Sequence, residues 1–134
     1  MNITSAVLSG GKNVRMGGRS KALLLIDNVP IIERTIGLFK GIFDEILIVT
    51  NSPKEYSRYQ NDCLIVKDII ENVGPLGGIH AALSQTTKEA VFFVACDMPN
   101  LHNGIITRQI DYFNTVVCDA LIPRIGHFLE PLHA

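Results

Sequence analysis

Short apolar runs alternate with segments of helical periodicity along most of this chain, and this alternation limits the folds that it can adopt. The expected strands are Ile3–Leu8, 45–50, Leu64–Val66, Ala90–Ala95 and 115–122, with an edge strand at 128–132. The expected helices are 31–41, Pro53–Tyr59, 79–84 and 101–113. Such alternation is typical of a three-layer α/β domain with a mostly parallel sheet. Ligands of such sheets bind beyond the carboxyl ends of the strands.

Length and charge narrow the classes of function. The 134 residues are enough for one domain, 1–134, with its own core. The formal net charge of -1 gives no overall field that attracts nucleic acid or an anionic membrane. We find no signal peptide and no apolar run of about 18 residues that would span a bilayer. The three cysteines, 63, 96 and 118, have no CxxC spacing and are expected to be reduced, buried thiols of a cytoplasmic protein.

A glycine-rich stretch with four basic residues follows the first expected strand. Its glycines are Gly10, Gly11, Gly17 and Gly18, and its cations are Lys12, Arg15, Arg19 and Lys21. Glycine lets a ligand approach backbone N–H groups closely, and cations among such groups favour a nucleotide phosphate chain. The stretch contains neither GxGxxG nor GxxxxGK[ST], so it matches neither of the two common phosphate-binding motifs. The alternative interpretation is a solvated surface turn.

Two aspartates follow expected strands at the same edge of the sheet. Asp97 comes after 90–95, where its carboxylate could hold Mg²⁺ together with nucleotide phosphates. Alternatively, Asp97 is an N-cap for the segment that follows. Asp68 follows Leu64–Val66 and is either a ligand contact or a turn former. Gly77 and Gly78 either approach a base or ribose, or permit tight packing.

Other reactive side chains give weaker signals. The four histidines have no metal-ligand spacing and are expected to be structural or surface residues. Cys96 has no identifiable histidine base, so we expect a small buried side chain rather than a nucleophile.

Several segments resemble the molybdenum cofactor guanylyltransferase family, in the order in which that family carries them. They are LSGGKNVRMGGRSKALL at 8–24, NVPIIER at 28–34, GPLGGIHAAL at 74–83, FVACDMPNL at 93–101 and EPLHA at 130–134. The resemblance implies a Rossmann-like nucleotide-diphospho-sugar transferase fold. It also implies transfer of GMP from GTP to the acceptor Mo-molybdopterin, which yields molybdopterin guanine dinucleotide and pyrophosphate.

The resemblance also implies roles for individual residues. Leu8, Ser9 and Gly10 would contact the nucleotide through backbone groups, with Gly11 supporting the same turn. Lys21 and Arg15 would neutralise the triphosphate, and Asp68 would bind the guanosine portion. Asp97 would contact GTP and hold Mg²⁺, which makes Arg15, Lys21 and Asp97 the expected catalytic residues. Gly74, Pro75 and Leu76 would help to shape the base pocket, whereas Asn51 is left out of the expected site.

One departure from the family bears on activity. The sequence ends at Ala134, whereas family members continue and carry a later NxNTP-like motif, so the C-terminal portion of the family is expected to be missing here. A non-catalytic GTP-binding module is therefore one alternative. A molybdenum cofactor cytidylyltransferase is another, although its members usually have alanine where Gly10 stands and lack the GPLGG loop. The expected partners are GTP and Mo-molybdopterin, without nucleic acid or membrane, and the sequence leaves the oligomeric state open.

Overall fold

The computed structural model describes residues 2–10, 15–16 and 19–130, and a parallel sheet of four strands lies at its centre. The strands are β1 (Ile3–Leu8), β6 (Ile46–Val49), β7 (Leu64–Val66) and β8 (Ala90–Ala95). Their order across the sheet is β7-β6-β1-β8, and every pairing is parallel. The expected strands at these four places and the mostly parallel sheet are confirmed.

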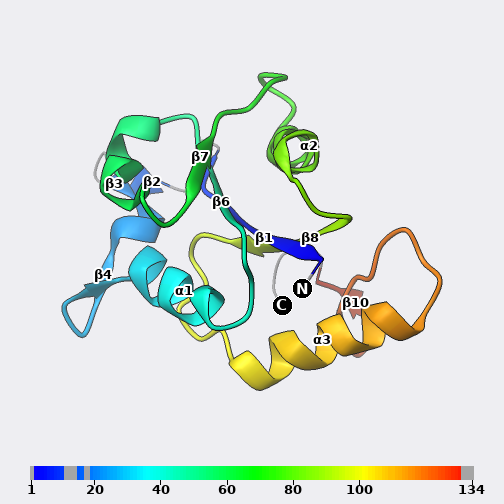
Figure 1. Ribbon diagram of the computed structural model, residues 1–134. Helices are drawn as coiled ribbons and strands as arrows, with labels where there is room; N and C mark the ends of the chain where they lie inside the picture. Colours follow the sequence, from blue (N-terminus) through cyan, green and yellow to red (C-terminus); the bar gives the residue numbers. More distant parts are fainter. Residues whose placement is uncertain (1, 11–14, 17–18, 131–134) are drawn as a thin grey trace.

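Helices cover both faces of the sheet, which completes the three layers (Figure 1). The helices are α1 (Ile31–Lys40), the 3-10 helix η3 (Pro53–Tyr59), α2 (Pro75–Gln85) and α3 (Asn103–Thr115). α1, η3 and α3 pack on one face, and α2 packs on the other. Side chains alternate between these faces along each strand, as a pleated strand requires. Val7 and Ile48 join the first cluster, whereas Leu8 and Val49 join the second.

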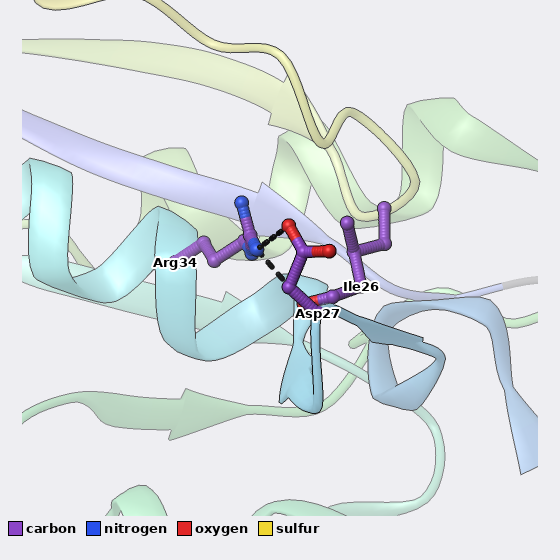
Figure 2. A network of polar contacts seen from close by, with 3 residues as sticks. All are labelled: Ile26, Asp27 and Arg34. Atoms are coloured by element: carbon purple, nitrogen blue, oxygen red, sulfur yellow. Dashed lines mark hydrogen bonds and ion pairs between the residues drawn. The ribbon is translucent and has the colours of Figure 1, made fainter.

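A small hairpin connects the glycine-rich stretch to α1. β4 (Leu25–Ile26) pairs antiparallel with β5 (Val29–Pro30). Asp27 and Asn28 between them have φ values of 51° and 63°, the left-handed conformation that a tight two-residue hairpin turn uses. Arg34 in α1 donates through Nη2 to the Ile26 carbonyl at 2.8 Å and to Asp27 Oδ2 at 3.1 Å (Figure 2). The hairpin is therefore tied to the helix that follows it.

Two expectations for the last part of the chain are wrong. Residues 116–123 form no strand, and Val117 is fully exposed, because the described structure places no neighbouring strand beside them. Farther on, β10 (Phe128–Leu129) pairs with β9 (Arg124–Ile125) in a separate two-stranded sheet, not at the edge of the main sheet. Residues 131–134 lie outside the described part of the chain. An apolar run becomes a strand only where a partner can satisfy its backbone groups.

Two further observations concern the burial of the cysteines and the length and polarity of the helices. Cys63 and Cys96 are buried as expected, whereas Cys118 is exposed in the segment after α3. Across the described residues, each helix is too short or too polar to cross a membrane.

Candidate functional site

A small pocket opens where the carboxyl ends of the central strands meet the start of α2. Its volume is about 110 Å³, and its lining consists of Leu8, Gly10, Val49, Asp68, Gly74, Pro75, Gly78 and Ala95. The order of the strands reverses between β1 and β8, and open α/β sheets bind their ligands at such a point. A larger cavity of about 230 Å³ between α1 and residues 98–101 contains none of the expected site residues.

The register of β6 against β7 places Asp68 in this pocket beside Asn51. Val49 pairs with Val66, so Asn51 and Asp68 each follow the paired position by two residues. Asn51 Nδ2 donates to Asp68 Oδ2 at 3.4 Å. Asp68 Oδ1 is buried and has no hydrogen-bond partner among the described residues. Because a buried carboxylate oxygen without a donor is destabilising, the pocket offers an acceptor that a ligand N–H or O–H could satisfy.

Asn51 is the residue that sequence reasoning left out. The sequence did offer an indication that Asn51 lies beside Asp68. Asn51 follows the end of β6 by two residues, and Asp68 follows the end of β7 by the same number. The ends of neighbouring parallel strands lie side by side, so equal offsets bring such residues together. The missing information was which residue of β6 pairs with which residue of β7.

The glycines at the start of α2 allow the helix to approach the pocket closely. α2 begins at Pro75 rather than at 79, so Gly77 and Gly78 lie within the helix and are buried. A Cβ on Gly77 would lie 2.9 Å from the Ile70 carbonyl oxygen and 3.3 Å from Asp68 Oδ2. A Cβ on Gly78 would lie 3.1 Å from Leu8 Cδ2. Tight packing therefore accounts for both glycines.

Asp97 lies at the same edge of the sheet, two residues beyond β8. Leu8 pairs with Ala95, and the Cys96 N–H donates to the Leu8 carbonyl at 3.1 Å, so Gly10 and Asp97 leave the sheet at equivalent positions. Asp97 is exposed, and it does not cap α3. The N-cap is His102, whose Nδ1 accepts from the Gly104 N–H at 3.1 Å.

Asp97 is the residue expected from the sequence to hold Mg²⁺ together with nucleotide phosphates. Within the described ranges, no group of three or more His, Cys, Asp or Glu side chains could hold a metal ion. Mg²⁺ commonly takes one or two protein carboxylates and completes its shell with phosphate oxygens and water. The exposed carboxylate of Asp97 suits that mode of binding and not an all-protein cage.

Lys21 is brought to this edge through its two neighbours in the chain. The Oγ atom of Ser20 lies 3.1 Å from that of Ser9, which directly follows β1. Ala22 is buried in the same core cluster as Cys96, which directly follows β8. Burial raises the pKa of the Cys96 thiol, although hydrogen bonds from Ser9 and Ala22 oppose the shift. Lys21 and Asp97 thus lie at the same end of the sheet.

Two further expected site residues, Gly11 and Arg15, belong to the glycine-rich stretch. Gly11 lies outside the described residues. The backbone of Arg15 belongs to β2 (Arg15–Met16), which pairs with β3 (Arg19–Ser20), and Arg15 is opposite Ser20.

Several known structures have folds similar to that of this chain. One is CMP:2-keto-3-deoxy-manno-octonic acid synthetase complexed with CTP, with a TM-score of 0.72 and 12% identity, covering 86% of this chain and 48% of the other. Another is Rv0371c from Mycobacterium tuberculosis, with a TM-score of 0.70 and 20% identity, covering 85% of this chain and 61% of the other. A third is a nucleotidyl transferase from Methanothermobacter, with a TM-score of 0.66 and 18% identity. The match covers 82% of this chain and 57% of the other. At these identities the likeness establishes the nucleotide-diphospho-sugar transferase fold.

Relatives found by comparison of sequences have a higher identity to this chain than these structures have. A probable molybdenum cofactor guanylyltransferase from Clostridium perfringens is 37% identical over 133 residues, covering 98% of this chain and 64% of the relative. One from Peptoclostridium acidaminophilum is 38% identical, covering 98% and 60%. The molybdenum cofactor guanylyltransferase of Syntrophotalea carbinolica is 34% identical, covering 98% and 61%. The chain thus spans less than two thirds of the length of these relatives. Residues 5–134 match the family described as the MobA-like NTP transferase domain, and the chain belongs to that family.

Proposed function

We propose that this chain binds GTP at the carboxyl edge of its sheet and transfers GMP to Mo-molybdopterin, forming molybdopterin guanine dinucleotide and pyrophosphate. The observation that carries the proposal is the pocket in which Asp68 presents a buried, unpartnered carboxylate oxygen among the described residues. Guanosine offers N–H and O–H donors to such an oxygen. Relatives named as guanylyltransferases support GTP over CTP as the donor.

The proposed reaction joins two anions, so positioning and charge neutralisation are its main requirements. A phosphate oxygen of Mo-molybdopterin attacks the α-phosphorus of GTP, and the bond from that phosphorus to the β-phosphate oxygen breaks. Lys21 and Arg15 neutralise the triphosphate, and backbone groups of Leu8, Ser9 and Gly10 contact the nucleotide. Asp97 would hold Mg²⁺, whose charge would stabilise the departing pyrophosphate. No protein nucleophile is needed.

Nucleotide binding is the first test. Calorimetry with GTP, CTP and ATP, each with Mg²⁺, should show tight binding of GTP alone. A ligand that binds only the folded chain at 100 times its Kd adds about 2.7 kcal/mol of stability, so thermal unfolding provides an independent check. Equal binding of CTP would favour a cytidylyltransferase, and no response to any nucleotide would refute the proposed site.

Turnover is the second test. Pyrophosphate release from GTP should require both Mo-molybdopterin and Mg²⁺, and chelation with EDTA should stop it. Binding of GTP without pyrophosphate release would reduce the function of this chain to a GTP-binding module. The same assay on a chain extended to the length of the relatives would separate a missing acceptor site from a wrong donor.

A further inference from the structure

Three buried hydroxyl groups meet just beyond the end of β1. They belong to Ser9, Ser20 and Tyr56, whose exposed fractions are 5%, 2% and 0%. Tyr56 OH lies 2.6 Å from Ser20 Oγ and also hydrogen-bonds to Ser9 Oγ, and the two serine oxygens are 3.1 Å apart. We call these three residues the hydroxyl cluster.

The hydroxyl cluster joins both ends of the glycine-rich stretch to a third element. Ser9 precedes Gly10 and is anchored to the sheet, because its N–H donates to the Val49 carbonyl at 2.7 Å. Ser20 precedes Lys21, and its Oγ accepts from the Ala22 N–H at 3.4 Å. Tyr56 comes from η3, on the face of the sheet that α1 and α3 also cover. Through these contacts the tyrosine hydroxyl links Ser20, which precedes Lys21, to Ser9 at the end of β1.

The surroundings of Tyr56 hold its side chain in one position. Its side chain is fully buried in the larger core cluster, so its ring has little freedom to move. Burial raises the pKa of the Tyr56 hydroxyl, against hydrogen bonds from Ser20 and Ser9, and the group stays protonated at neutral pH. A protonated hydroxyl both donates and accepts, and can bond to both serines at once.

We propose that Tyr56 is a positioning residue for nucleotide binding, which holds Ser9 and Ser20 together and thereby places Gly10 and Lys21 around the triphosphate. The proposal rests on the proposed function for the identity of the ligand. Tyr56 itself touches no substrate. Its effect reaches the nucleotide through the spacing of the two serines.

The test compares two tyrosines of the same 3-10 helix. Tyr56→Phe removes the hydroxyl that joins the serines. Tyr59→Phe removes a hydroxyl that instead donates to Glu33 Oε1 in α1 at 2.9 Å. Each variant loses one hydrogen-bonding hydroxyl of a buried tyrosine, so urea unfolding should show similar losses of stability. Measured well below both unfolding transitions, the Kd for GTP should rise about fivefold to tenfold in Tyr56→Phe and stay within about twofold in Tyr59→Phe.

A second variant and a second readout keep the proposal refutable. Ser20→Ala removes one of the two hydroxyl partners of Tyr56 and should also raise the Kd for GTP. The loss of GTP affinity in the double variant should be smaller than the sum of the two single losses, because both substitutions remove the Tyr56–Ser20 hydrogen bond. Hydrogen exchange of the amides of residues 20–24, measured without nucleotide, should speed up in Tyr56→Phe and not in Tyr59→Phe. If Tyr56→Phe fails to fold, Ser20→Ala is compared with Tyr59→Phe in both readouts.

The outcomes separate this proposal from the proposed function. Unchanged GTP affinity in Tyr56→Phe, or equal losses in both tyrosine variants, would overturn the role of Tyr56. If the unaltered chain binds no GTP, the proposed function fails, and hydrogen exchange still decides whether Tyr56 orders residues 20–24. Unchanged exchange in Tyr56→Phe would overturn the proposal in that case.

Discussion

Replacing Gly77 by alanine tests whether the start of α2 is packed as closely against the pocket as the structure shows. The new Cβ would lie 2.9 Å from the Ile70 carbonyl oxygen, 3.0 Å from Val73 Cγ2 and 3.3 Å from Asp68 Oδ2. The nearest of these atoms belongs to the backbone, so a side-chain rotation cannot relieve the contact. The segment that carries Asp68 or the helix itself must move.

Two opposing effects determine how much Gly77→Ala changes the free energy of unfolding. Alanine within a helix is about 0.5–1 kcal/mol more favourable than glycine. Overpacking of a close contact typically costs about 1–3 kcal/mol. The expected net effect of Gly77→Ala is a loss of about 0.5–2 kcal/mol. Asp68 is one of the crowded groups and is the proposed contact to guanosine. A shift of its carboxylate should therefore also lower GTP affinity several-fold.

Two other helical glycines provide matched controls. A Cβ on Gly37 in α1 meets no described heavy atom within 4 Å, so Gly37→Ala should stabilise the fold by about 0.5–1 kcal/mol. A Cβ on Gly78 would lie 3.1 Å from Leu8 Cδ2, the end of a side chain that can shift slightly. Gly78→Ala should therefore fall between the other two variants.

Urea unfolding measures this series. With a slope of about 1–3 kcal/mol per molar urea, a change of 1 kcal/mol moves the midpoint by about 0.3–1 M. Calorimetry with GTP is run on the same proteins. If Gly77→Ala proves as stable as Gly37→Ala, the close approach of α2 to residues 68–73 is wrong.

Three further substitutions test other parts of the structure. Asp97→Asn should leave the urea midpoint unchanged and abolish Mg²⁺-dependent pyrophosphate release; full activity would contradict its assignment. Lys21→Ala should weaken GTP binding about tenfold or more in calorimetry, since a charged hydrogen bond to phosphate contributes about 1.5–3 kcal/mol; an unchanged affinity rules that role out. Burial favours a raised pKa for Glu45, but hydrogen bonds from Thr4, Thr87 and Thr86 outweigh it and hold the pKa below 4.5. Its stabilising effect is present above pH 4.5 and is lost as the pH falls through the folded pKa. Glu45→Gln should therefore have a lower urea midpoint than the unaltered chain at pH 7, and the difference should shrink as the pH falls through the folded pKa. A difference independent of pH would refute this account.

The local pattern of the sequence predicted the main elements well. β1, β6, β7 and β8 follow from short β-branched and apolar runs, and α1 follows from a stripe of apolar residues at helical spacing. These signals come from side chains a few residues apart, which share one face of one element. Asp68 and Asp97 could be placed at the sheet edge for the same reason, because each closely follows a strand.

Other features depended on residues that are distant in the chain. The run 115–122 has a strand-like composition, but the described residues place no strand beside 116–123, and a strand cannot satisfy its backbone groups alone. Asn51 meets Asp68 only through the register of β6 and β7. Tyr56 meets Ser20 across 36 residues.

The sequence by itself therefore determined where most of the strands and helices form, since propensity and periodicity depend on residues close together in the chain. Only the tertiary structure decided which strand ends are neighbours, and hence which side chains share the pocket and the hydroxyl cluster. The physical reason is that such contacts depend on strand order, register and helix approach, which are set by packing the whole chain at once.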